Sequence, residues 1–334
     1  MLMSVSKRVL LIIPVFASYR SQAQTPPMSV INSIPLATDS RHGYAMLLIA
    51  AGSVAISFGG LIQRSLETSD PWQIIFYRSL GMLIAATLIV SIRYRGRFVQ
   101  TLLGIGKMGV LGGVLVSIAG MAFIQSLVHT TIANALFVLG MIPFFAAFFA
   151  RLFLGEKLRR TTLITMIAAA IGLAIMVIKG VNAGSGFGNL MALITAISFA
   201  LYAIIVRYKR QTEMMPVMLL SSVIIILISL TVKYGDMSVS IRDILLCLFW
   251  GGCLSGFVNY MFIIASRHLA AAEVTLIMLL EFALGPIWVW LFIGETPSMW
   301  TILGGCIIIL AVALRAIFEL IYKPKKEQTP KILV

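Results

Sequence analysis

The sequence LFLGEKL at residues 152–158 returns as LFIGETP at residues 291–297, which is 139 positions later in the chain. Further upstream, GYAM at 43–46 matches GNLM at 188–191 with an offset of 145. The same offset of 145 pairs Ser53 with Ser198, Ser57 with Tyr202 and Pro71 with Pro216. These matches indicate that the chain is built from two similar halves.

Both halves are too apolar for a soluble protein. Of the 334 residues, 60% are hydrophobic and 11% are charged, and the mean hydropathy is +1.02. Soluble domains are about 45–50% apolar and about 25% charged, and a chain of this size cannot bury the excess. Membrane barrels are excluded because their strands alternate apolar and polar residues. The composition therefore predicts an all-α polytopic membrane protein and excludes a disordered or nucleic-acid-binding chain.

Ten stretches are long and apolar enough to be membrane spans, which need about 20 residues each. They cover residues 44–62, 72–92, 108–127, 131–152, 161–179, 189–206, 216–233, 244–265, 271–293 and 299–320. Each half contains five spans, and an odd number requires the second half to enter the membrane upside down relative to the first. We expect ten transmembrane helices arranged as two inverted five-helix repeats. The repeats cover 44–180 and 188–321, with an N-terminal extension at 1–43 and a basic cytoplasmic tail at 322–334.

The basic residues predict the orientation of these spans. The chain has 26 Lys and Arg against 12 Asp and Glu, a formal net charge of +14. With the N-terminus inside, 21 basic residues fall in cytoplasmic segments, four in outside loops and one, Arg78, within a span. This asymmetry follows the positive-inside rule. It predicts that both termini are cytoplasmic and accounts for the net charge without a nucleic-acid partner.

The N-terminal extension is expected to be cytoplasmic and dispensable. Residues 9–17, VLLIIPVFA, resemble the core of a signal peptide, but no clean cleavage site follows and nine residues are too few to span a membrane. The alternative is that translation starts at Met28.

Several motifs resemble those of the drug/metabolite transporter superfamily, in its ten-helix branch with two EamA repeats. The likeness covers about 43–321 and rests on Tyr77-Arg78, on HTTIANALFVLGMIPFFAAFFARLFLGEKL at 129–158, and on EFALGPIWVWLFIGETP at 281–297 followed by Gly304-Gly305. One difference is that Glu281 is followed by Phe282, whereas family members often have an adjacent Glu-Pro. The resemblance implies that spans 1–4 and 6–9 surround a central cavity, with spans 5 and 10 at the periphery. It also implies that the protein moves small organic metabolites or drugs.

The inverted repeats point to transport as the function. Such repeats place a substrate site near the middle of the membrane and rock about it. We therefore expect a secondary, gradient-driven transporter in the plasma membrane (the bacterial inner membrane), working by alternating access, with export slightly favoured and protons as a coupling ion. We expect no cofactor and no metal, and the Walker lysine of an ATPase is absent. The alternative is an integral-membrane enzyme or assembly factor. The sequence leaves the oligomeric state open, including a homodimer.

Glu281 and Arg78 are the charged site candidates. Glu281 is ten residues into its span, about 15 Å from the end, which is the midplane. A carboxylate there costs several kcal/mol unless it is protonated or paired. This position predicts a proton-coupling or substrate-amine site, with a structural hydrogen bond as the alternative. Arg78 either snorkels outward or faces the cavity as the counter-ion of Glu281 or of a substrate carboxylate.

The remaining site candidates are aromatic or small and polar. Trp288 is seven residues beyond Glu281 on the same helix face, where it is placed either to stack on a planar or cationic substrate or to pack. Small polar side chains follow helix faces in three spans, as expected for cavity lining or for close helix packing. These residues are Ser53, Ser57, Ser198, Tyr202, Asn259 and the adjacent Tyr260.

Overall fold

The structure is a computed structural model that describes residues 38–68, 70–93, 100, 104–130, 135, 138–156, 158–177, 186–294 and 298–321. Most of the expected N-terminal extension, including Met28, and the basic tail at 322–334 lie outside these ranges. The chain divides into two compact units, Met1–Ser40 and Arg41–Val334, of which the second contains the expected repeats. Within the described ranges every regular element is a helix. The predicted all-α class is confirmed.

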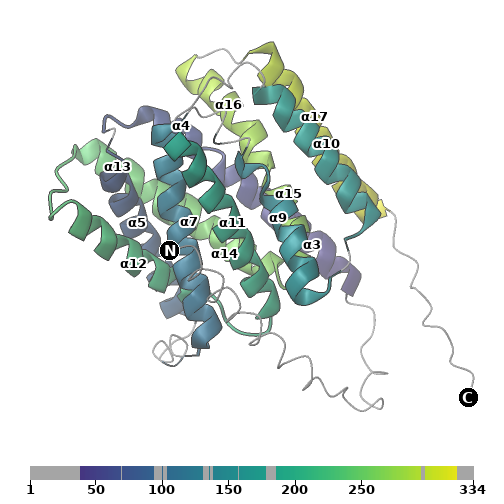
Figure 1. Cartoon of the computed structure of the whole chain (residues 1–334), viewed down its shortest axis with the longest axis horizontal. Coiled ribbons are helices and arrows are strands. Elements are labelled where there is room, and N and C mark those ends of the chain that lie inside the picture. Colours follow the sequence, from purple (N-terminus) through teal and green to yellow (C-terminus); the bar gives the residue numbers. More distant parts are fainter. Residues whose placement is uncertain are drawn as a thin grey trace, which may run out of the picture. The chain divides into compact units, whose positions relative to one another are not determined.

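The helices follow the chain in two series (Figure 1). The first half contains α3 (Thr38–Ile56), α4 (Gly59–Ser65), α5 (Pro71–Arg93), α7 (Gly106–His129), α9 (Ile142–Phe149), the π-helix η2 (Ala150–Leu154) and α10 (Arg160–Val177). The second half contains α11 (Gly186–Tyr208), α12 (Pro216–Val232), α13 (Ile241–Phe249), the π-helix η3 (Trp250–Gly256), α14 (Phe257–Ala265), α15 (Ala271–Ile277), α16 (Leu280–Ile293) and α17 (Met299–Ile321).

The repeated glycine of LFLGEKL and LFIGETP ends a helix in each half. Gly155 follows η2 with a φ of 66°, and Gly294 follows α16 with a φ of 82°. Both values lie in the left-handed region, which glycine adopts without a steric penalty. The motif that defines the repeat is therefore a helix-capping signal at the same place in both halves.

Six helical segments are long and apolar enough to cross a membrane by length and composition. They are His42–Ser65, Pro71–Arg93, Gly106–His129, Gly186–Tyr208, Ile241–Ala265 and Ala271–Ile293. Four shorter apolar helices, Ile142–Leu154, Arg160–Ile175, Pro216–Val232 and Ile302–Leu314, fall in the other four expected spans. Residues 131–134 and 136–137 of the expected fourth span lie outside the described ranges. The count of ten spans stays a prediction.

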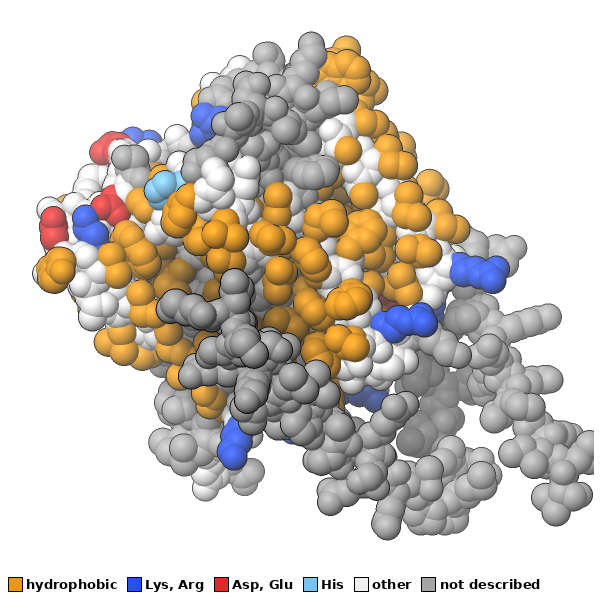
Figure 2. Space-filling model, in the orientation of Figure 1, with side chains coloured by type: hydrophobic (Ala, Val, Ile, Leu, Met, Phe, Trp, Pro, Cys, Tyr) orange, Lys and Arg blue, Asp and Glu red, His pale blue; other side chains and the backbone are white. Residues whose placement is uncertain are grey.

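The most extensive helix pairings each join the first half to the second. Helix α7 packs along α11, α10 along α17, and α5 against both α12 and η3. Figure 1 shows α10 and α17 side by side. Hydrophobic side chains spread over the face seen in Figure 2, while most of the coloured charged groups lie toward its edges. Exposed leucines such as Leu88 and Leu227, 56% and 58% accessible, suit contact with lipid rather than water.

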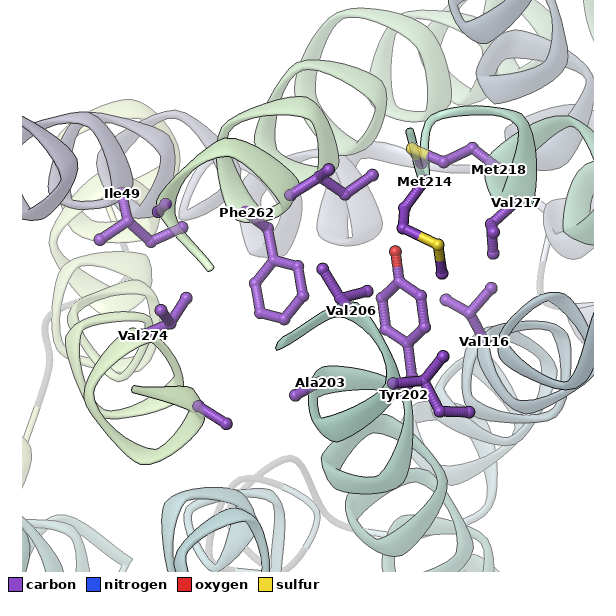
Figure 3. Packing of buried hydrophobic residues seen from close by; sticks show 14 of the residues in the cluster. Ile49, Val116, Tyr202, Ala203, Val206, Met214, Val217, Met218, Phe262 and Val274 are labelled. Carbon is purple, nitrogen blue, oxygen red and sulfur yellow. The ribbon is translucent and has the colours of Figure 1, made fainter. Parts of the chain in front are cut away.

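The largest buried cluster fills the space between helices of both halves. Tyr202 and Phe262 stack with their ring centroids 5.7 Å apart. In Figure 3 the ring of Tyr202 lies among Val116, Val206, Met214, which precedes α12, and Met218 in the first turn of α12, and its hydroxyl points toward Met214. This close packing fixes α7, α11, α12 and α14 relative to one another.

Candidate functional site

A cavity of about 150 Å³ lies among the helices of both halves. Its lining comes from α3, α5, α7, α9, α11, α12, α14, α15 and α16, and none of the described residues of α10 or α17 takes part. This arrangement agrees with the central cavity and peripheral fifth and tenth spans that the resemblance implies. The walls are mainly apolar and include Phe123, Phe199 and Phe262. Arg78 and Glu281 are the two charged residues among those that line it.

Irregular backbone occurs in three of the segments beside the cavity. The first expected span breaks at Ser57 and Phe58, between α3 and α4, and the eighth passes through the π-helix η3. The ninth breaks at Met278 and Leu279, between α15 and α16. Non-helical backbone at membrane depth is tolerated where it is buried in protein or lines a cavity. Among the described residues of these three stretches, Met278 and Leu279 are the ones that line the cavity.

Glu281 follows the break between α15 and α16. Its backbone N–H donates to the carbonyl of Met278 at 3.1 Å, a three-residue spacing that tightens the turn. The carboxylate lies in the first turn of α16, where the helix dipole favours a negative charge. Glu281 is half-buried and faces the cavity.

Arg78 reaches the same cavity from α5. Its Nη2 donates to Oγ of Ser255 at 3.1 Å. The guanidinium carbon lies 4.9 Å from the ring centroid of Trp250 and 5.8 Å from that of Phe123. Nε of Arg78 is buried and has no hydrogen-bond partner among the described residues. The same part of the chain contains no direct ion pair between Arg78 and Glu281.

The backbones of α5 and η3 touch at the position of Arg78. A Cβ atom built on Gly251 would lie 2.6 Å from the carbonyl carbon of Arg78. A Cβ atom on Gly81 would lie 2.9 Å from the carbonyl carbon of Leu248. Real Cβ atoms do not come so close to backbone, so glycine is required on both sides of the contact. Two glycines thus bring the guanidinium of Arg78 within reach of η3.

Two of the small polar candidates belong to helix contacts or to the cavity wall. Asn259 lines the cavity, and its Nδ2 donates to the carbonyl of Ser255 at 2.9 Å. Ser53 is buried and donates to the carbonyl of Ile49 at 2.8 Å, with a longer contact of 3.4 Å to the carbonyl of Ile277 on α15. Ser53 therefore joins α3 to α15 and is not part of the cavity wall.

Trp288 and Ser57 contact each other. Nε1 of Trp288 donates to Oγ of Ser57 at 2.7 Å, and its ring stacks on Phe58 with the centroids 4.3 Å apart. Neither Trp288 nor Ser57 lines the cavity. The pair joins the break between α3 and α4 to helix α16. The role of Trp288 in stacking on a substrate stays a prediction.

The other three candidates lie away from the cavity wall. Tyr202 is fully buried in the apolar cluster of Figure 3, with no hydrogen-bond partner for its hydroxyl among the described residues. Ser198 is buried on the same helix. The hydroxyl of Tyr260 accepts a hydrogen bond from Nη1 of Arg93 at 3.0 Å on an exposed surface.

Sequence reasoning missed Trp250 and Phe123. Their contacts with Arg78 join residues 172 and 45 positions apart, so no local pattern reveals them. The available signal was Arg78 itself, because an arginine within a span requires compensating groups nearby. Among the described residues, no three His, Cys, Asp or Glu side chains come together as a metal site.

Two segments of the chain, 43–178 and 186–316, match the model of the EamA-like transporter family. The chain belongs to this family. The resemblance to the drug/metabolite transporter superfamily is confirmed, and this EamA-like chain is a membrane transporter with two matching segments. Members of the family are transporters, which agrees with the expectation that the chain is not an enzyme.

The EamA-like chain is also similar to individual proteins. It is 22% identical to the pseudopaline exporter CntI of two Pseudomonas aeruginosa strains over 284 residues, which cover 81% of this chain and 94% of the exporter. A protein of known crystal structure superposes with a TM-score of 0.67 at 15% identity, covering 83% of this chain and 97% of that protein. The structural likeness shows that the two share a fold.

Proposed function

We propose that this EamA-like protein is a secondary, gradient-driven transporter of small organic metabolites or drugs that works by alternating access. The observation that carries the proposal is the cavity, which contains one arginine and one glutamate and is lined by residues of both family segments. A site shared between two repeats is accessible from each side in turn when the repeats rock against each other.

The proposed topology is ten transmembrane helices in two inverted repeats, at 44–180 and 188–321, with both termini in the cytoplasm. The extension at 1–43 and the tail at 322–334 remain outside the repeats in this proposal. The pairing of helices across the two halves supports the repeat symmetry. The membrane is proposed to be the bacterial inner membrane.

Contacts between the two halves occur at both ends of the helices, as a gated cavity requires. The buried carboxylate of Asp243 accepts the backbone N–H groups of Glu67 and Thr68, at 3.1 and 2.8 Å. In the proposed orientation these residues lie on the outer side. On the cytoplasmic side, Nε of Arg207 donates to Oε1 of Glu156 at 2.9 Å. Each set joins a loop of the first half to the second half, and opening either side would break one of them.

Glu281 is the proposed coupling residue and Arg78 its partner in recognising the solute. A carboxylate in a largely apolar cavity favours the protonated form unless a cation compensates it. A cationic group of the solute and a proton then compete for the same carboxylate, and this competition couples their fluxes. The aromatic residues of the wall suit a solute with an apolar part.

Export is the proposed direction. The similarity to the pseudopaline exporter, which matches this chain along most of its length, supports this direction. At 22% identity to that exporter, the proposal does not include pseudopaline as the solute of this chain.

The experiment begins with an untargeted comparison of the metabolites inside and outside cells of a deletion strain and its parent. A solute that differs is then tested in proteoliposomes under an imposed pH gradient. We expect Glu281→Gln to insert normally and to lose gradient-driven transport. The control is Glu67→Gln, since Glu67 is 59% exposed in a loop and its ion pair is of little energetic value. Wild-type pH dependence in Glu281→Gln would refute proton coupling, and chemical conversion of the solute would refute transport.

A further inference from the structure

We propose that Arg78 forms a subsite for a carboxylate group of the transported solute, and that Trp250 and Ser255 of η3 are its positioning residues. This inference rests on the proposed function, because it assigns a role within the transport cavity. It names the chemistry of one end of the solute.

The charge of Arg78 is incompletely satisfied in the structure. An unpaired cation away from water is costly. Among the described residues the compensation comes from one side-chain hydrogen bond, to Ser255, and from the rings of Trp250 and Phe123. Cation–π contacts stabilise a cation more strongly when it is desolvated than when it is exposed. The guanidinium therefore tolerates its position without a carboxylate, yet it retains donors that are not used.

The unused donor is the most specific observation. Nε of Arg78 is buried and lacks a hydrogen-bond partner among the described residues, and Arg78 lines the cavity. A buried donor without a partner is rare in native structures and requires an explanation. The planar guanidinium presents its N–H groups in a fork that matches a carboxylate in a two-bond arrangement. Nε itself has almost no accessible surface, so a carboxylate entering the cavity would meet the guanidinium first and would reach Nε as the Arg78 side chain shifts toward it.

Glu281 does not already fill this role. Its charge attracts Arg78, and both line the cavity, but no direct ion pair joins them in the described part of the chain. A carboxylate of the solute can thus bind Arg78 without first displacing Glu281.

Trp250 and Ser255 are held in place by packing, which suits positioning residues. Trp250 is 2% exposed and Ser255 is 1% exposed. A Cβ atom on Gly59 would lie 2.8 Å from Nε1 of Trp250, so the start of α4 lies directly against the indole. Both residues belong to a π-helix, a feature that occurs often at functional sites. The π-helical turn brings an aromatic ring and a hydroxyl to the same guanidinium.

The test uses two probes that differ only at the proposed contact, 3-phenylpropanoate and its neutral amide 3-phenylpropanamide. Binding to the purified full chain in detergent is measured from the ligand-dependent rise in unfolding temperature. For the wild type we expect the carboxylate to bind about tenfold or more tightly than the amide, as hydrogen bonds to charged groups imply. Equal affinities, or no binding of the carboxylate at millimolar concentration, would overturn the proposal.

The variants separate positioning from general packing, because the readout is the ratio of the two affinities. Arg78→Gln should abolish the preference, whereas Ser255→Ala and Trp250→Phe should reduce it several-fold while leaving amide affinity unchanged. Ser255→Ala and Trp250→Phe keep the charge of Arg78, so they still test the proposal if Arg78→Gln fails to fold. Ser117→Ala is the control, since Ser117 is equally buried but donates to backbone carbonyls and does not line the cavity. An unchanged ratio in both η3 variants would refute the positioning roles.

This binding experiment uses no gradient, so its outcome is separate from that of the transport assay. Gradient-driven transport without a carboxylate preference would refute the subsite alone. An Arg78-dependent preference in a protein that moves no solute would instead refute the proposed function.

Discussion

Gly251→Ala is expected to separate α5 from η3 and to displace Arg78. The added methyl group would lie 2.6 Å from the carbonyl carbon of Arg78 and 3.0 Å from its Cα. Ordinary contact begins at about 3.4 Å. The neighbouring atoms are backbone and cannot rotate away, so the two helices must move apart.

The magnitude follows from two opposing effects. Inserting a methyl group into a packed interior costs about 1–3 kcal/mol, and the upper end applies at Gly251 because the obstacle is backbone. Alanine stabilises a helix by about 0.5–1 kcal/mol relative to glycine, because its backbone loses less conformational entropy on folding. We expect a net loss of about 2 kcal/mol, the difference between these two values.

The assay is the apparent midpoint of thermal unfolding in detergent at a fixed heating rate, together with the carboxylate preference described above. The matched control is Gly60→Ala, because a Cβ atom on Gly60 meets no atom within 4 Å. We expect the midpoint to fall by several degrees for Gly251→Ala and to stay level or rise for Gly60→Ala. Equal midpoints and equal carboxylate preference in both variants would refute the close approach of α5 to η3.

Two further predictions concern contacts between the halves. Trp288→Phe and Ser57→Ala should each destabilise the protein by about 1 kcal/mol, and they should show coupling in a double-mutant cycle because each removes the same hydrogen bond. Trp300→Phe, at a site that is 38% exposed, serves as the control. Burial acts to raise the pKa of Asp70, but the hydrogen bond from Lys233, the charge of Lys233 and the backbone N–H groups of Trp72 and Gln73 together outweigh it, so this pKa lies below its ordinary value. The hydrogen bond with Asp70 also raises the pKa of Lys233. Asp70 should contribute at most about 1 kcal/mol to the free energy of unfolding. This contribution should be fully present above the ordinary pKa of Asp70 and lost as the pH falls through its lowered pKa. The contribution of Lys233 to stability should be lost as the pH rises through its raised pKa. Unfolding midpoints of the wild type and Asp70→Asn across this pH range test both signs, and a difference that persists in strong acid would contradict them.

Much of the fold was predictable because it depends on composition and on repeated local signals. Continuous apolar stretches predict helices, and the matched glycines at 155 and 294 predict where a helix ends in each half. Arg78 and Glu281 were also predictable as site candidates, because a charge within an apolar stretch is costly wherever it lies. The structure places both of them on one cavity.

The contacts around these charges were not predictable, because they depend on which helices meet. Helical periodicity places Trp288 and Glu281 on one face, yet the structure directs Trp288 to Ser57 and leaves Glu281 at the cavity. The π-helix η3 has the sequence WGGCLSG, and its three glycines indicate a close approach of another helix but do not distinguish a π-helix from a regular helix. Its geometry is tied to the contact with α5, which involves residues far apart in the sequence.

The position of Arg78 thus results from the contact between α5 and η3, which is one of the contacts that hold the two halves together. Gly251 allows η3 to touch α5 and Gly81 allows α5 to touch Leu248 at the end of α13, and this contact brings Ser255 and Trp250 to the guanidinium. A change that loosens the interface between the halves therefore also alters the environment of the cavity's cation. In a transporter whose halves move relative to each other, the affinity of Arg78 for an anionic group would change during the same motion. Such a change is what a transporter needs to bind a solute on one side and to release it on the other.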